Sequence, residues 1–391
     1  MIKLLGDWAP LDRNVVKCDF DKFIFLNIEG PVIKNQISNL PKAGPSMYNK
    51  SFIKTRSKGV GILANNHLFD YGNKGYKKTL KVLNENGWFA VGAGTSKEKA
   101  RKPLIIKLRD VSIGVVATCE TQFGKSGIDK PGVSCFDPSI YKEIYNLKKK
   151  VDLIIVSYHG SAEMLPWPSP DRQELFRSLV DAGADIIYGH HSHTPQGWER
   201  YSNGLIFYGL GNYCVDPAKW SWHPNGNWSL TPEISYIDKK INFKIKTTII
   251  KDHGKEISVN NTNKKEFAKH LSYLKLCNEP LKNRKLLEGL WQEASLKMYY
   301  AYYSNWLGIN DLKKNNTYLT CKSFVRSLIK ELWFKKKQLK KKRYLLYYHL
   351  FACDSHKEAI STALGVLGDE LKDFRNKKTK KMVDKWMVNK L

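Results

Sequence analysis

The sequence lacks long apolar runs. No stretch approaches the roughly 20 consecutive apolar residues that a membrane-spanning helix needs, and the apolar segment before Gly6 is too short to be the core of a signal peptide. We therefore expect a cytoplasmic protein, whose contact with a membrane, if it has one, is peripheral and at the inner face.

Paired cysteines are also absent. The seven cysteines are odd in number, and no two of them form a Cys-x-x-Cys pair. This pattern argues against a disulfide framework and against a zinc–thiolate site, and it fits a reducing compartment.

Arginine is scarce although the chain is strongly basic. The formal net charge is +28, yet 54 of the 65 basic residues are lysines. Base readout in DNA usually relies on arginine, and no known nucleic-acid-binding motif accompanies the charge. The composition therefore argues against nucleic acid as a partner.

What the sequence does contain is a set of short apolar runs, each ending in polar residues that can bind a metal. Such runs, bounded by turn residues, predict buried strands, and open α/β sheets build their sites at the carboxyl ends of strands. Half of the ten histidines lie in these segments. The segments are 1–7, 23–29, 61–67, 151–159 and 185–193. Their strand ends are predicted to meet in one metal-type site.

The segment 185–193 carries the densest group of such side chains. Its apolar run stops at Gly189, and three histidines follow. Side chains two residues apart on an extended chain lie on the same side, so we expect His191 and His193 to face one point while His190 points away. Imidazole is a common ligand of zinc, manganese and iron. For this segment alone, the alternative is a chance histidine cluster on a surface loop.

A second polar group follows the strand predicted at 60–64. Asn65, Asn66 and His67 stand in sequence, and Asp70 lies three residues beyond His67. If Asp70 accepts one ring proton of His67, the imidazole keeps a fixed tautomer and can serve as a general acid. We therefore predict a catalytic role for His67, supported by Asp70.

Three helices are predicted between these strands. They span 73–86, 141–150 and 170–182. The last has Ser169 in the N-cap position and Pro170 at the first helical position, a favoured combination. Strands alternating with helices indicate an α/β domain.

Two hairpins and three loops complete the predicted domain. The hairpins are expected at 104–118 and, closing the domain, at 234–250. The segments 34–58, 119–138 and 217–230 are expected to be loops that shape the substrate site. Their composition does not identify the substrate.

The pattern changes in residues 251–391. The formal charge rises from +11 over 1–250 to +17 over 251–391, and strand-like runs become rare. We predict a basic, mainly α-helical C-terminal region with an apolar helix face at 286–291. A capping box is expected to begin at Ser355, with Glu358 as its partner.

One segment of this region is especially basic. From Lys335 to Arg343, seven of nine residues are basic, and aromatic residues flank them. Such a segment can lie on an anionic membrane surface or bind an acidic polymer. A solvated helix face is an equal alternative.

The order of the motifs in residues 1–250 resembles a known family. The motifs are Gly-Asp at 6–7, Asn-Ile-Glu-Gly-Pro at 27–31, Leu-Ala-Asn-Asn-His-Leu-Phe-Asp-Tyr-Gly at 63–72, Gly-Ala-Gly at 92–94, His159 with Glu163, Asp-Ala-Gly-Ala-Asp-Ile-Ile-Tyr-Gly-His-His-Ser-His at 181–193 and Tyr-Gly-Leu-Gly-Asn-Tyr at 208–213. In this order they resemble the CapA family, the capsule and poly-γ-glutamate synthesis proteins, whose fold is similar to that of calcineurin-like metallophosphoesterases. Residues 251–391 lie outside the resemblance.

The resemblance implies a fold and a metal site. The fold would be a four-layer α/β/β/α metallophosphatase-like sandwich, followed here by the helical extension. One or two divalent transition-metal ions (Mn, Fe or Zn) would stabilise an anionic transition state. By this resemblance Asp7 and His193 would hold one ion, Asn66, His159 and His191 the other, with Glu29 between them and His67 as the acid near the leaving group.

Two positions depart from the family pattern. Ala9 stands where the phosphoesterases have a histidine ligand, so the first ion has few protein ligands. After His159 the family usually has Trp-Gly, whereas Gly160 and Ser161 follow here. The second departure keeps the ligand but changes the wall beside it.

Two functions are consistent with these observations. The favoured hypothesis is a metal-dependent hydrolase that acts on a phosphoester, or on an amide or ester of an anionic polymer, in capsule or poly-γ-glutamate biosynthesis. The alternative is a non-catalytic factor that assembles such a polymer or docks at the membrane. Bound metal with turnover that is lost in His191→Ala supports the first function. Polymer binding through the basic segment, without turnover, supports the second.

Overall fold

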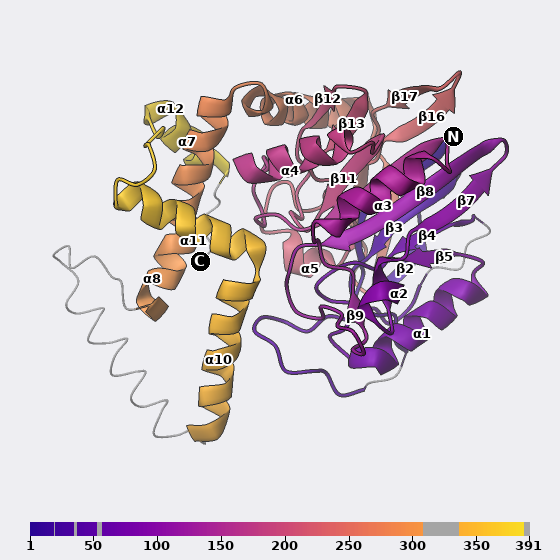
Figure 1. Ribbon diagram of the computed structural model, residues 1–391, viewed down its shortest axis with the longest axis horizontal. Coiled ribbons are helices and arrows are strands. Elements are labelled where there is room, and N and C mark those ends of the chain that lie inside the picture. The colour runs from indigo at the N-terminus through magenta and orange to yellow at the C-terminus, as the bar shows by residue number, and fades with distance from the viewer. Residues whose placement is uncertain (19, 35–36, 53–56, 308–335, 387–391) are drawn as a thin grey trace.

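The computed structural model describes residues 1–391 except 19, 35–36, 53–56, 308–335 and 387–391. For residues 305–306 and 336–340 it describes the backbone only. Figure 1 shows two sheets packed together with helices outside them, and a group of C-terminal helices beside this sandwich.

The first sheet has seven strands, and its central strand is β1. In order they are β17 (Lys240–Lys244), β16 (Glu233–Ile237), β1 (Ile2–Ala9), β3 (Phe23–Ile28), β4 (Gly59–Ile62) and β5 (Phe89–Val91), with β14 (Asn212–Val215) also paired to β1. The pairs from β1 to β5 are parallel, and β16 and β17 are antiparallel. Because β16 pairs only with the beginning of β1, β14 can pair with its end, which places Asn212 opposite Asp7.

The second sheet has six strands. In order they are β12 (Trp198–Tyr201), β13 (Gly204–Phe207), β11 (Ile186–His190), β10 (Leu153–His159), β8 (Val111–Cys119) and β7 (Leu104–Leu108). The four inner strands are parallel, and the two edge strands are antiparallel. The predicted hairpin at 104–118 is confirmed, because β7 and β8 pair antiparallel.

The first four residues of β10 are all apolar because both faces of the strand are buried. Leu153 and Ile155 belong to the core between the two sheets, whereas Ile154 and Val156 belong to a second core beneath α3 (Ser139–Lys148) and α4 (Pro170–Asp181). A strand that is buried on both faces has no polar alternation. The predicted N-cap of α4 is also confirmed, because Ser169 Oγ accepts a hydrogen bond from the Arg172 amide at 3.2 Å.

Helix α1 (Gly72–Glu85) covers the outer face of the first sheet. Its Leu83 is buried and packs against Gly61, where a Cβ atom would lie 2.8 Å from Leu83 Cδ1. The layers are therefore α1, the first sheet, the second sheet, and α3 with α4. This confirms the predicted four-layer α/β/β/α sandwich.

Two small sheets and two short helices complete this part. The small sheets are β15 (Trp228–Leu230), β18 (Thr247–Asp252), β19 (Glu256–Asn261) and β2 (Asn14–Lys17) in one, and β6 (Ala93–Gly94) with β9 (Gly132–Val133) in the other. The short helices are α2 (Lys97–Arg101) and α5 (Pro217–Trp220).

The closing hairpin predicted at 234–250 is only partly correct. β16 and β17 form a hairpin, but the chain then enters the four-stranded sheet as β18, which pairs with β15. The break lies at residues 245–246, between β17 and β18, so the second strand of the predicted hairpin is divided between two sheets.

After β19, all the regular secondary structure of the described residues is helical. The helices are α6 (Lys264–Leu281), α7 (Arg284–Ala294), the π-helix η1 (Ser295–Tyr300), α8 (Ala301–Leu307), α10 (Lys336–Ala352), α11 (Asp354–Leu367) and α12 (Lys377–Trp386). The predicted apolar face at 286–291 is confirmed, since Leu286, Leu287, Leu290 and Trp291 are buried. Within the described part of the chain, no helix has the length and apolarity needed to cross a bilayer.

Two expectations for the C-terminal region have a different outcome. The capping box at Ser355 is wrong, because the N-cap of α11 is Cys353, two residues earlier, and the Ser355 hydroxyl donates instead to the buried Glu120. The basic segment lies partly outside the described residues. Of its side chains, Lys341, Lys342 and Arg343 are described and are exposed.

Candidate metal centre

The carboxyl ends of the parallel strands meet between the two sheets. β1 carries Asp7, the turn after β3 carries Glu29, and β10 ends in His159. All three side chains are fully buried. The strands approach closely here, since a Cβ atom at Gly6 would lie 1.9 Å from the Gly211 carbonyl oxygen. A glycine before Asp7 is therefore required for β14 to pass beside β1.

Asn27, in β3, links the two sheets at the site. Its side-chain amide donates to Asp7 Oδ1 at 2.8 Å and lies 3.2 Å from His159 Nδ1. If Asn27 donates to this nitrogen as well, the ring proton of neutral His159 is on Nε2, which lies 3.0 Å from Asn66 Oδ1. A metal ion that replaced this proton would find Asn66 as its second ligand.

The turn that presents Asn66 and His67 is closed by Asn65. Its Oδ1 accepts from the Leu68 amide at 2.9 Å, and its Nδ2 donates to the Ile28 carbonyl at 2.8 Å. Asn65 therefore acts on the backbone, whereas the neighbouring side chains of Asn66 and His67 line the cavity.

The prediction that His190 points away from the site is wrong. His190 Nδ1 lies 3.0 Å from Asp7 Oδ1. Its side chain follows the alternation of β11, but the next residues do not, because His191 has φ 81° and His193 has φ 54°. Positive φ angles end the extended geometry. Beyond His190, side chains two residues apart therefore need not lie on the same side.

His193 lies between the two buried carboxylates. Its Nδ1 is 3.6 Å from Asp7 Oδ2, and its Nε2 is 3.8 Å from Glu29 Oε1. Asn212 Oδ1, 2.9 Å from Nδ1, and the stacked ring of Trp220, at a centroid distance of 3.8 Å, fix the imidazole. Potential ligand atoms of Glu29, His191 and His193 all lie within 4.8 Å of one another.

The structure brings the six predicted metal ligands together. Besides the contacts above, His159 Nε2 is 3.8 Å from Glu29 Oε1, and the rings of His159 and His191 lie 4.9 Å apart. Burial, together with the neighbouring imidazoles, lowers the pKa of both histidines well below its usual value. Neutral imidazoles offer the lone pairs that a metal needs. The six residues are Asp7, Glu29, Asn66, His159, His191 and His193.

These residues fit a divalent cation. Among the described residues, both Glu29 carboxylate oxygens, Asp7 Oδ2 and His191 Nδ1 are buried without a hydrogen-bond partner. Burial raises the pKa of Glu29 to about 8, although His193 opposes the shift. Buried polar atoms are usually paired, and a cation between these atoms would supply the partner that they lack.

The predicted contact between His67 and Asp70 is present. His67 Nδ1 lies 2.7 Å from Asp70 Oδ2. Lys42, which the sequence did not single out, donates to Asp70 Oδ1 at 2.7 Å and to the Asn66 carbonyl at 3.2 Å. The role of His67 as an acid stays a prediction.

A cavity of about 300 Å³ opens over the site. Each of the three loops predicted to shape it contributes, and so do two histidines of the C-terminal region, which the sequence did not place there. The lining includes Lys42, Met47, Gln122, Phe123, Glu163, Lys219, Trp220, His349 and His356, besides Asn66, His67, His191 and His193. A larger depression of about 420 Å³, lined by Arg177 and Arg284 among others, contains none of the predicted site residues.

Comparisons with known proteins identify relatives of the chain. It is 38% identical over 201 residues to the PGA biosynthesis protein CapA of Bacillus subtilis, covering 49% of this chain and 52% of that protein. It is 34% identical over 204 residues to the capsule biosynthesis protein CapA of Bacillus anthracis, covering 49% of each. The chain thus spans about half the length of these relatives.

Similarity to solved structures is low. The crystal structure of a hypothetical protein from Thermus thermophilus is 13% identical with a TM-score of 0.37, covering 67% of this chain and 99% of that one. A family model matches residues 16–217, which is just over half of the 391 residues. The chain therefore belongs to the family described as bacterial capsule synthesis protein PGA_cap.

Proposed function

We propose that the chain is a metal-dependent hydrolase of capsule or poly-γ-glutamate biosynthesis. Its substrate would be a phosphoester, or an amide or ester of an anionic polymer. The observation that carries the proposal is the group of buried, unpaired carboxylate and imidazole atoms of Glu29, Asp7 and His191, of which His191 lines the cavity. Buried charges without partners cost free energy of folding. Groups of buried titratable side chains of this kind are typical of functional sites.

Six residues would hold the metal, and a seventh is a candidate. Asp7 and His193 would bind one ion, and Asn66, His159 and His191 the second, with Glu29 between them. His190, 3.0 Å from Asp7, is a candidate for the ligand that Ala9 does not supply. When bound, divalent ions of this kind supply positive charge that stabilises an anionic transition state.

The other residues of the cavity would bind and orient an anionic substrate. The basic residues Lys42 and Lys219 line its wall, and Trp220 stacks on His193. His67 faces the same cavity and is held by Asp70, so it is positioned to give a proton to a leaving group. The enclosing side chains would limit the access of bulk water.

Metal content and turnover measured on the same samples test this proposal. Wild type, Asp7→Ala and His191→Ala would be compared. His253→Gln serves as the control, because His253 is an exposed histidine that is not among the site residues. The readouts are elemental analysis and hydrolysis of p-nitrophenyl phosphate and its diester.

We expect one or two ions in the wild type and a loss of turnover by at least about 100-fold in the two ligand variants, because even outer-shell changes at metal sites cost about 10- to 100-fold. The control should behave like the wild type. A correctly folded wild type without metal would overturn the proposal. Bound metal without turnover of any ester would instead support the non-catalytic function.

The second candidate is a factor that binds polymer carboxylates without hydrolysing them. The observation in its favour is the exposed basic group of Lys341, Lys342 and Arg343 on α10, the helix that also supplies His349 to the cavity. This function predicts that replacing the three basic residues by glutamine weakens binding to polyglutamate or to anionic vesicles. Retention of binding in the triple variant would argue against it.

A further inference from the structure

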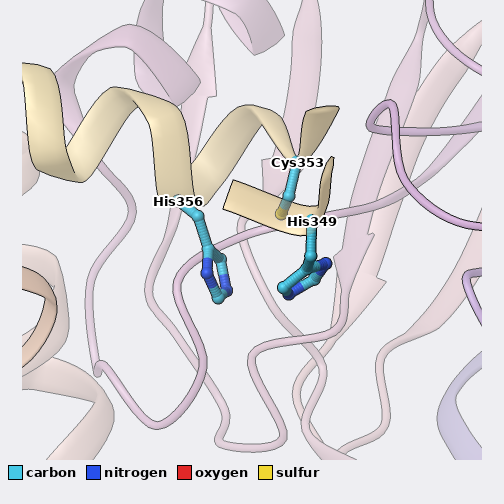
Figure 2. Close-up of side chains that lie close together, drawn as sticks. All are labelled: His349, Cys353 and His356. Carbon is cyan, nitrogen blue, oxygen red and sulfur yellow. The ribbon is translucent and has the colours of Figure 1, made fainter. Parts of the chain in front are cut away.

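The junction of α10 and α11 carries a second group of metal-type ligands, separate from the strand ends. Figure 2 shows the side chains of His349, Cys353 and His356 next to one another, projecting to the same side of the junction. Potential ligand atoms of the three residues all lie within 4.8 Å of one another.

The local fold explains why these residues meet. They are spaced four and three residues apart, and residues with this spacing share one face of a helix. Here α10 ends at Ala352, and Cys353 takes an extended conformation (φ −76°, ψ 116°) as the N-cap of α11. The Cys353 amide still bonds to the His349 carbonyl at 2.9 Å. The bend therefore keeps His349 and His356 next to Cys353.

The histidine rings are oriented by their neighbours. His356 Nδ1 lies 2.6 Å from the Tyr303 hydroxyl, which leaves Nε2 for another partner. Metal-binding histidines usually have such a contact on the second nitrogen. The His349 ring stacks on Phe123 at a centroid distance of 5.4 Å. Its Nδ1 is buried and has no hydrogen-bond partner within the part of the chain that the structure describes.

We propose that His349, Cys353 and His356 bind one Zn²⁺ ion through two imidazole nitrogens and one thiolate. Zinc prefers nitrogen and sulfur ligands in tetrahedral geometry, and sites with three protein ligands keep a fourth position open. Manganese and magnesium prefer oxygen ligands. The sulfur therefore distinguishes this site from the strand-end cluster, whose six predicted ligands offer only nitrogen and oxygen.

Zinc binding here requires one deprotonation. In the structure Cys353 Sγ lies 3.5 Å from Glu120 Oε1, to which a thiol can donate. Binding replaces the sulfur–hydrogen bond by a zinc–sulfur bond and releases the proton to solvent. The product carries one net positive charge at the junction. His349 and His356 are neutral without the metal, because burial lowers their pKa to about 4 and about 3.

The position of the site gives the ion a possible ligand from the cavity. His349 and His356 line the same cavity of about 300 Å³ as His191 and His193. The fourth position of the zinc would thus be open to an anionic group bound over the strand ends. The binding of zinc itself does not depend on whether the strand-end cluster hydrolyses anything.

Cobalt titration of the full-length, metal-stripped chain tests the proposal. Co²⁺ replaces Zn²⁺ in such sites, and a thiolate ligand gives a near-ultraviolet charge-transfer band that nitrogen and oxygen ligands do not give. We expect a band whose final intensity corresponds to one cobalt–thiolate site per chain and that disappears when Zn²⁺ is added. Cys353→Ser should abolish the band, and His349→Gln should weaken cobalt binding at this site at least tenfold.

Matched variants separate this site from the others. Cys277→Ala removes a buried cysteine of α6 and should keep the band. Asp7→Ala changes the strand-end cluster and should keep it too, which separates a failure of this proposal from a failure of the proposed hydrolase.

Two outcomes would overturn the zinc site: the absence of a band in the wild type, and a band that persists in Cys353→Ser. If Cys353→Ser does not give a folded chain by circular dichroism, His349→Gln decides. Unchanged cobalt binding in that variant would mean that the three residues only pack together.

Discussion

At the residue scale, the site depends on side chains whose position the sequence predicts unequally well. The contact between His67 and Asp70 is predicted by their spacing of three residues. The strand ends that carry Glu29 and His159 are predicted by the apolar runs before them. Lys42 could not be predicted, because it is one of 54 lysines and no pattern marks it. Its place in the segment 34–58 was the only signal.

His190 was missed for a different reason. The rule that neighbouring side chains alternate holds only while the backbone is extended, and the sequence does not announce that His191 and His193 take positive φ angles. Residues other than glycine rarely adopt this conformation, and such strain is found where surrounding structure enforces it, often at functional sites. The departure from the rule therefore lies at the site itself.

The Asp70→Asn variant tests the role of Asp70 as a positioning residue. Asp70 Oδ2 contacts His67, and its carboxylate also binds Lys42 and the Met47 amide. We expect kcat for p-nitrophenyl phosphate to fall by about 100-fold, with KM and metal content almost unchanged, because Asp70 is not among the metal ligands. Asp12→Asn, at a carboxylate bonded to Tyr48 on the surface, is the control. A loss of metal in Asp70→Asn would assign Asp70 a structural role instead.

At the element scale, long buried strands were predictable, whereas exposed or very short strands were not. β10 and β11 are continuous apolar runs because both of their faces are covered. β2 (Asn14–Lys17) has no fully buried residue, so its sequence carries no apolar pattern. β15 was missed although all three of its residues are buried, because so short a run has no readable period. The four-stranded sheet that contains β2 and β15 was therefore not predicted.

This sheet is joined to α6 by an aromatic contact that predicts a pH dependence. His270 of α6 stacks on Trp228 of β15 with ring centroids 3.9 Å apart. Burial lowers the pKa of His270 from 6.5 to about 4. Its contribution to stability is thus complete above pH 6.5 and is lost as the pH falls through 4, because the unfolded chain binds the proton first.

His270→Phe should remove this part of the pH dependence while keeping the stack. A shift of this size corresponds to about 3 kcal/mol for a fully buried ring, and we expect about 2 kcal/mol after screening by nearby solvent. The free energy of unfolding in urea, measured at pH 7.5 and 4.5, should therefore decrease by about 2 kcal/mol less in the variant than in the wild type. His253→Gln, an exposed histidine, should retain the wild-type difference. Equal pH dependence in all three proteins would contradict the assignment.

At the scale of the whole molecule, the C-terminal helices are part of the site rather than an appendage. The family match ends at residue 217, and the basic composition of residues 251–391 suggested only a docking function. Nothing in that composition shows that His349 and His356 reach the cavity, although their spacing with Cys353 is visible in the sequence. Contacts between distant segments decide such placements, and one sequence does not contain them.

Helix α11 contacts the sandwich at Glu120, whose buried carboxylate also pairs with Arg172 of α4, and removal of this ion pair should be costly. Arg172 Nη2 lies 3.2 Å from Glu120 Oε2, the oxygen that also accepts from Ser355 of α11. Arg172→Met leaves the Glu120 carboxylate buried without its cation, so we expect a loss of about 3–5 kcal/mol in the free energy of unfolding and faster amide hydrogen exchange in α11. Arg375→Met breaks an exposed pair with Asp373 and should cost about 1 kcal/mol or less. If the two variants are equally stable, α11 is held by its apolar contacts and not by Glu120.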